Sequence, residues 1–424
     1  MNMPVMSEAV PGSDRSRGIE PPGERFHSLD ALRAFVMLLG VVFHSAISFV
    51  PPPRGIWTAA AADNSLPLRW FMSYSHSFRM AVFFLLAGFF AWHVIGNKGM
   101  AAFVRGRARR ILLVFVVALC LLNLGRTVLW TDGGIKTGRT FFSPDLASLS
   151  LWDFTLRLLK PEAWPVIRLM HLWFLYYLLL MTGLFLLLRW LALRLAGDPT
   201  RLLQAADRGF RRAISSRLAP VWMALLMVPL MSLMLRYNID TPDRSLALNY
   251  PVLAIYTFYF SIGWWLRRQP DLLEVFARRW KPLLLMGLAV SFIDLNNQYL
   301  RDFGADMSTL KWACFFAASL TTALGVLGWL GLFVAVLRRP SPGARYLADS
   351  SYWVYLAHLP IVIGLQIWFL DWHSLWLKLL AINVITYSAL FWTYHRFVRF
   401  TWVGTWLNGR RQVIPVLAAA GDRV

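Results

Sequence analysis

Residues 31–50 have the sequence ALRAFVMLLGVVFHSAISFV. Arg33 and His44 are the only ionisable side chains in this stretch. A helix of this length, rising 1.5 Å per residue, is about 30 Å long, which matches the hydrocarbon core of a bilayer. Because backbone amides need internal partners in lipid, a continuous apolar run of this length indicates a membrane-spanning helix.

Nine further runs of about 17–26 apolar residues follow the first. They cover residues 78–96, 111–130, 171–194, 220–236, 250–266, 282–300, 312–337, 350–370 and 376–397. The whole chain has 424 residues, 58% of them hydrophobic and 15% charged, with a mean hydropathy of +0.51. A soluble chain carries more charge and less apolar surface, so a soluble enzyme is excluded. We predict an all-α integral membrane protein built as a bundle of about ten transmembrane helices.

Basic residues predict the orientation of the chain. With the N-terminus in the cytoplasm, the cytoplasmic tails and connections hold 29 of the 43 Lys and Arg, whereas the 22 acidic residues divide evenly. The positive-inside rule then places both termini in the cytoplasm. The net charge of +21 reflects this topology, and we expect no nucleic-acid partner. We predict a disordered cytoplasmic tail over 1–26, a transmembrane domain over 27–400 and a cytoplasmic C-terminal tail over 401–424.

The first span carries the strongest candidate for chemistry. Arg33 and His44 are eleven residues apart, so they share one helix face about 16 Å apart along the axis. Asp30 lies on the same face, but it is about 21 Å from His44 and is better placed to orient Arg33. An imidazole inside a span is a candidate general base for a hydroxyl. The alternative is that Asp30 and Arg33 are interfacial anchors and that His44 bonds another helix.

Further candidates lie near the ends of other spans. Arg107 and Arg110 project from one helix face and are suited to phosphate oxygens, although cytoplasmic Arg residues also serve topology alone. His76 and Arg79 are one turn apart at the outer end of the second span, where they either hold an acceptor sugar or carboxylate or reach toward the headgroups. His171, Trp173 and His358 are candidates for the same outer substrate site.

Other chemistries find no support in the sequence. Cys120 and Cys314 both lie in apolar runs, and no zinc-ligand spacing, phosphate-binding loop or nucleophile elbow occurs. We therefore predict no metal site and no tightly bound cofactor. A different class of function is a transporter or flippase for a glycan or a lipid-linked precursor, with the His and Arg residues lining its path. The concentration of charge at span ends, with His44 and His358 inside, favours a reaction centre.

In order and spacing, these motifs resemble the acyltransferase 3 family of integral-membrane acyltransferases. The resemblance covers residues 25–400 and rests on Arg33-x10-His44, Arg107-x-x-Arg110, the HLWFL segment at 171–175 and the SYWVYLAHLP segment at 351–360. Within the family, the HSFRM segment at 76–80 is similar to the glucan biosynthesis protein C branch, in which succinyl groups are added to periplasmic glucans. One departure is Ala87, where many relatives have Ser.

The resemblance implies an O-acyltransferase that uses cytoplasmic acyl-CoA and modifies an extracytoplasmic glycan, such as a periplasmic glucan. Arg33, Arg107 and Arg110 would hold the donor, and His44 would remove the proton of the acceptor hydroxyl. Other extracytoplasmic acceptors, such as a lipopolysaccharide sugar, fit the same resemblance. Membrane lipid is a further expected partner of the basic loops. The resemblance implies neither an oligomeric state nor the partner that orients His44.

Overall fold

The computed structural model describes residues 26–50, 57–59, 65–137, 168–234, 238–242, 245–302 and 308–409. Helices dominate these residues, and no strand occurs among them. The longest helical run consists of α2 (Leu66–Arg107), the π-helical turn η2 (Ala108–Leu112) and α3 (Leu113–Thr137). The other elements are α1 (His27–Ala46), η1 (Ile47–Phe49), η4 (Met170–Leu172), α6 (Trp173–Leu195), α7 (Pro199–Ser215), α8 (Ala219–Met231), α9 (Tyr250–Arg268), η5 (Pro270–Leu272), α10 (Leu273–Asp302), α11 (Lys311–Val336), α12 (Pro342–Trp368), α13 (Leu375–Thr393), η6 (Tyr394–Val398) and α14 (Trp402–Asn408).

Polar caps fix where several helices begin. The Ser65 hydroxyl accepts a hydrogen bond from the Leu68 backbone N–H at the start of α2, and the Asn249 side chain does the same for Val252 in α9. Ser341 and Ser374 cap α12 and α13 in this way. Such caps satisfy backbone N–H groups that the first helical turn leaves without a partner. The starting points are therefore encoded locally.

The ten predicted spans all lie wholly or mainly on helices. By length and composition, five helices of the described residues are able to cross a membrane, and the pair α7 and α8, bent by 107°, is a sixth candidate. One of the five runs from Leu66 to Thr137, and its 72 residues exceed the roughly 20 that a single crossing needs. The all-α membrane class is confirmed. The number ten and the orientation of the termini remain predictions.

Three connections differ from the prediction. The stretch 51–77, between the first and second predicted spans, already contains the first turns of α2, and the stretch 98–110, between the second and third, is helical apart from a break at Gly99. Gly99 has φ 79° and ψ 168°, a conformation that residues with a Cβ avoid. The charged connection near 189–217 contains α7. Hydropathy misses such segments because polar residues also form helices. Residues 138–167, between the third and fourth predicted spans, lie outside the described residues.

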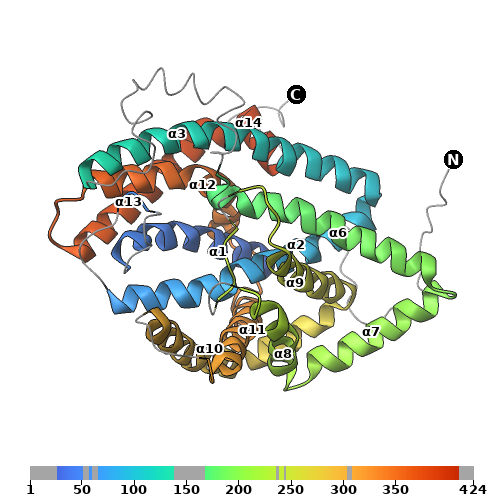
Figure 1. The fold of residues 1–424 in the computed structure, drawn as a ribbon. Helices are drawn as coiled ribbons and strands as arrows, with labels where there is room; N and C mark the ends of the chain where they lie inside the picture. Colours follow the sequence, from blue (N-terminus) through green and yellow to red (C-terminus); the bar gives the residue numbers. More distant parts are fainter. Residues whose placement is uncertain are drawn as a thin grey trace, which may run out of the picture.

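The bundle is built around α1. Figure 1 shows α1 near the middle, with α3, α12 and α13 on one side and α9, α10 and α11 on the other. The most extensive helix contacts are α10 with α11, α2 with α9, and α1 with α12. The pairing of α1 with α12 brings the first predicted span beside the ninth.

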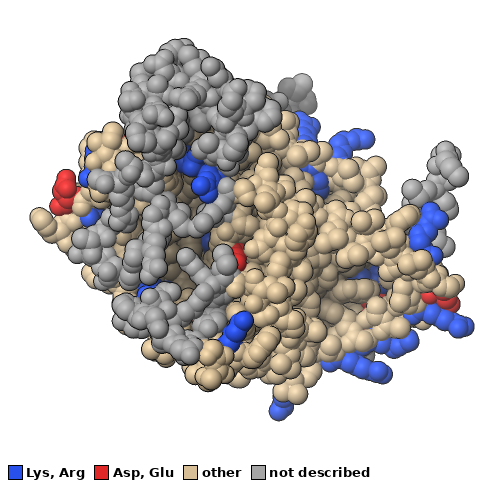
Figure 2. Space-filling view, viewed as in Figure 1, with Lys and Arg blue, Asp and Glu red and all other residues tan. Residues whose placement is uncertain are grey.

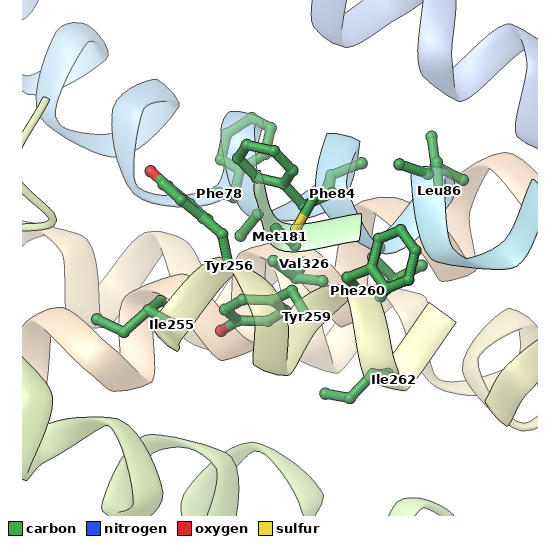
Figure 3. Packing of buried hydrophobic residues seen from close by; sticks show 14 of the residues in the cluster. Phe78, Phe84, Leu86, Met181, Ile255, Tyr256, Tyr259, Phe260, Ile262 and Val326 are labelled. Carbon is green, nitrogen blue, oxygen red and sulfur yellow. The ribbon is translucent and has the colours of Figure 1, made fainter. Parts of the chain in front are cut away.

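Aromatic and aliphatic side chains of α2, α6, α9 and α11 form the main core (Figure 3). Its centre includes the Phe84 and Tyr256 rings, whose centroids are 4.4 Å apart. Two glycines bring the backbones of α2 and α9 together: a Cβ on Gly88 would collide with the Phe260 carbonyl, and a Cβ on Gly263 would collide with the Leu85 carbonyl. Small residues allow this close approach where van der Waals packing holds membrane helices together.

The outer surface of the bundle is strongly apolar. Most of the described surface visible in Figure 2 is uncharged, and many of the visible Lys and Arg lie toward the right-hand and lower edges, near α7, with others near the top. Exposed apolar side chains occur on α3 (Leu113, Val116, Val117, Leu121), α10 (Leu285, Met286, Phe292, Ile293) and α13 (Leu377, Leu380, Val384, Ile385). Apolar exposure on this scale needs lipid to cover it.

Candidate active site

A cavity of about 70 Å³ opens between α1, α2, α12 and the start of α6. This volume exceeds the roughly 10–15 Å³ that a cavity needs to hold one water molecule. The cavity gathers the predicted base and all five residues predicted for the outer substrate site. Its lining includes His44, His76, Arg79, His171, Trp173 and His358, together with Val36, Met37, Gly40, Phe43, Met80, Phe83, Phe174, Thr241 and Tyr355.

His44 is oriented by a second histidine. Its Nδ1 lies 2.7 Å from the Gly40 carbonyl oxygen and 3.0 Å from Nε2 of His358, whose own Nδ1 is 2.7 Å from the Tyr355 carbonyl oxygen. Carbonyls only accept, so with both rings neutral each Nδ1 carries a hydrogen. His44 Nδ1–H then donates to Gly40 O and to the lone pair on His358 Nε2. This arrangement leaves the lone pair of His44 on Nε2, which has no hydrogen-bond partner in the described part of the chain.

His171 completes a cluster of three histidines. Its ring centroid lies 5.0 Å from that of His358 and 6.4 Å from that of His44. The ring is buried, and neither nitrogen makes a hydrogen bond within the described residues. No group of three His, Cys, Asp or Glu side chains in the described ranges has an arrangement suited to a metal ion. The cluster therefore places three imidazole rings at one small cavity.

Gln366 fixes the end of α1 that carries His44. Its side-chain nitrogen donates to the carbonyls of His44 (2.9 Å) and Ser45 (3.1 Å), and its side-chain oxygen accepts from Trp57 Nε1 (3.0 Å). Only 2% of Gln366 is exposed. Gln366 was not predicted, because the candidates inside the spans were chosen for an ionisable side chain and Gln has none. A search for neutral polar residues in the same runs would have found it.

Arg79 is buried beside the first span. Its guanidinium carbon lies 4.5 Å from the centroid of the Phe43 ring. Gly40 makes room for it, because a Cβ at that position would be 2.7 Å from Arg79 Nη1. Phe43 was not predicted as a site residue, although its position next to His44 was a signal.

His76 is held at the rim of the cavity. Its Nε2 lies 2.8 Å from the Ile239 carbonyl oxygen, and its ring stacks on Phe43 with centroids 5.9 Å apart. Thr241 follows on the same connection between α8 and α9, with its hydroxyl 3.5 Å from His76 Nε2. This connection therefore contributes to the cavity, a role that its sequence did not reveal.

The three arginines predicted to hold a donor lie outside this cavity. Arg33 pairs with Asp30 across 3.3 Å, as predicted from their spacing. The Arg107 guanidinium donates to the Ala87 carbonyl oxygen at 3.4 Å. The backbone carbonyl oxygen of Arg110 accepts a hydrogen bond from the Tyr352 hydroxyl at 2.8 Å. No ion pair involves Arg107 or Arg110 within the described residues.

One face of α12 joins these arginines to the cavity. Tyr352 contacts Arg110, Tyr355 stacks on Tyr352 with ring centroids 6.3 Å apart, and His358 follows one turn later. Six residues of helix rise by about 9 Å. The cationic group and the histidine cluster are therefore connected by a single row of side chains.

Comparison with known proteins agrees with these features. The acyltransferase domain model of the acyltransferase 3 family matches residues 26–405. The chain is similar to proteins named glucans biosynthesis protein C from Escherichia coli K12 and from Shigella dysenteriae serotype 1. It is 26% identical to each over 352 residues, which is 81% of this chain and 83% of each relative. No solved structure matches the chain.

The family match covers most of the chain, including the spans that carry His44, Arg79 and His358. It also accounts for the apolar helices, because this is a family of membrane acyltransferases. The chain therefore belongs to the acyltransferase 3 family and is a multi-pass membrane acyltransferase.

Proposed function

We propose that this protein transfers an acetyl or succinyl group from cytoplasmic acyl-CoA to a hydroxyl of an extracytoplasmic glycan, with a periplasmic glucan as the first candidate. The proposal rests on one cavity, which His44 and His358 line together with four other candidate residues, His76, Arg79, His171 and Trp173. The similarity to proteins named for glucan biosynthesis supports the choice of acceptor. The predicted topology supports a bacterial inner membrane with acyl-CoA on the cytoplasmic side.

His44 is the general base in this proposal. Its Nε2 lone pair takes the proton of the acceptor hydroxyl as the oxygen attacks the thioester carbonyl. His358 accepts from Nδ1–H and so fixes the tautomer and the orientation of the ring. His76, His171 and Trp173 surround the reacting groups and exclude water from them.

Arg107 and Arg110 hold the phosphates of the donor, with Arg33 nearby. Support comes from their spacing and from the lack of ion pairs to either residue in the described ranges. The row formed by Tyr352, Tyr355 and His358 then gives the acyl chain a path toward His44. No tightly bound cofactor or metal enters this scheme, and acyl-CoA is a substrate.

Removing the partner of His44 tests the orientation of the base. We expect His358→Phe to lower the turnover number by about 10-fold to 100-fold, because His44 becomes charged in the transition state and a hydrogen bond to a charged group contributes about 1.5–3 kcal/mol. His373→Phe, at an exposed position, is the control. Measured turnover that stays at the wild-type value would exclude an orienting role for His358.

The donor site is tested through Arg110. We expect Arg110→Ala to raise the KM for acyl-CoA by about 10-fold to 100-fold with little change in turnover, because one charge-assisted contact to phosphate is lost. Arg194→Ala, which removes a cation near the end of α6, should leave KM unchanged. A fall in turnover at an unchanged KM would contradict the assignment to donor binding.

The proposed function itself is tested in inverted membrane vesicles supplied with labelled acetyl-CoA or succinyl-CoA. We expect label in the extracted glycan from wild-type vesicles and none from vesicles without the protein. The donor that gives label identifies the acyl group. Absence of label with either donor, in vesicles that contain folded protein and a glycan pool, would refute the proposed reaction.

A further inference from the structure

Arg79 is a buried cation without an anionic partner. Its exposed fraction is 8%, and its Nε makes no hydrogen bond within the described residues. No carboxylate of the described chain lies within ion-pair distance of it. A buried charge is retained only where something compensates it. Contact with the Phe43 ring supplies a small part of that compensation, so the rest is expected from a bound species that carries negative charge.

The position of Arg79 relative to the base indicates when that negative charge arises. Its Nη1 rests against Gly40, whose carbonyl accepts from His44 Nδ1–H. Gly40 and His44 are one helical turn apart, so the guanidinium lies about 6 Å along α1 from the base and lines the same cavity. Tyr355 lines the same cavity.

We propose that Arg79 stabilises the oxyanion of the tetrahedral intermediate. This inference rests on the proposed acyl transfer. The acceptor oxygen bonds to the thioester carbon, its proton passes to His44 Nε2, and the carbonyl π electrons move to the oxygen that Arg79 faces. When the intermediate collapses, the oxyanion electrons re-form the carbonyl and the C–S bond breaks. The sulfur takes the proton from His44 and leaves as a thiol. Preorganised donors at such a position contribute a large share of catalysis in acyl transfer.

A carboxylate bound to Arg79 would give a different kinetic result from an oxyanion. If Arg79 instead bound the free carboxylate of a succinyl group, only the dicarboxylic donor would depend on it, and the dependence would fall mainly on KM. An oxyanion forms with every acyl group, and only after binding. Comparison of acetyl-CoA with succinyl-CoA therefore separates the two roles.

The experiment uses full-length protein in membrane vesicles and three variants. Arg79→Met removes the charge, and Arg79→Lys keeps the charge without the planar fork. Gly40→Ala keeps every functional group and places a methyl 2.7 Å from the present position of Arg79 Nη1, so the guanidinium must move. Gly183→Ala is the matched control, because a Cβ there meets nothing within 4 Å. Thermal stability of the purified proteins is measured alongside activity.

We expect Arg79→Met to lower turnover by about 10²-fold to 10³-fold, with KM little changed, for every donor that the wild type uses. Arg79→Lys should recover part of this loss. Gly40→Ala should lower turnover while its melting temperature stays near the wild-type value, which keeps the proposal testable if Arg79→Met does not fold.

Two results would overturn the oxyanion role. One is wild-type turnover in Gly40→Ala and in a folded Arg79 variant. The other is a loss confined to succinyl-CoA and to KM. If the wild type itself transfers no acyl group, the proposed function fails. If the wild type is active and the Arg79 and Gly40 variants keep its turnover, only the oxyanion role of Arg79 is refuted.

Discussion

Acyl transfer by the His44→Ala protein should fall by about 10²-fold to 10⁴-fold, the contribution of a positioned general base. The imidazole of His44 has its hydrogen on Nδ1, held by the Gly40 carbonyl and by His358, and Nε2 is left with the lone pair. Alanine removes the only group in the proposal that accepts the proton of the hydroxyl. Label transfer in vesicles, at saturating donor, measures the effect.

Protein level and thermal stability decide how the His44 result is interpreted. His44 is half-buried and its ring contacts a cavity, so removal of the ring leaves the backbone clamp of Gln366 on the His44 carbonyl in place. The variant should therefore fold. His373→Ala, at an exposed position outside the cavity, should be fully active. Wild-type transfer by a folded His44→Ala protein would remove His44 from the mechanism.

Loss of the folded protein is the expected result of Gly88→Ala. A Cβ at this position would overlap the Phe260 carbonyl, and a backbone carbonyl inside a helix has no alternative rotamer through which to move away. The α2 and α9 helices would have to separate along an interface that packs the main core. Overpacking of a tight core costs about 1–3 kcal/mol or more. The yield of monodisperse detergent-solubilised protein and its melting temperature provide the measurement.

Gly183→Ala separates the packing effect from a general effect of alanine. Gly183 lies on an exposed part of α6 with open space beside its Cα, so alanine there should leave stability unchanged or raise it by about 0.5–1 kcal/mol through helix propensity. A Gly88→Ala protein as stable as the Gly183→Ala protein would show that α2 and α9 do not pack this closely in the membrane.

Hydropathy located the helices well because transfer of apolar side chains into lipid is a local property of each run. It failed where the helix is polar. The segment near 98–110 and α7 carry many Arg residues, and a search for apolar runs assigned both to connections. The close pairing of α2 and α9 depends on Gly88 and Gly263 together, and neither glycine identifies its partner in the sequence.

Family motifs predicted more of the residues that line the cavity than spacing did. From spacing alone, His44 was one candidate with two interpretations, and His171 and His358 ranked below it. The structure places all three rings at one cavity with His76 and Arg79. Gln366, Phe43 and Thr241 were not predicted, because their roles arise from contacts that no motif records.

Hydropathy, charge and motif order act over short stretches of chain, so the order of residues was enough to predict an all-helical membrane acyltransferase with a histidine inside its first span. The groups that meet this histidine could not be predicted in the same way. His44 and His358 are 314 residues apart, and the Arg79 guanidinium fits against Gly40 only when α1, α2 and α12 pack together. The physical reason is that a hydrogen bond or a close contact depends on positions in space, and no helical period relates residues on different helices.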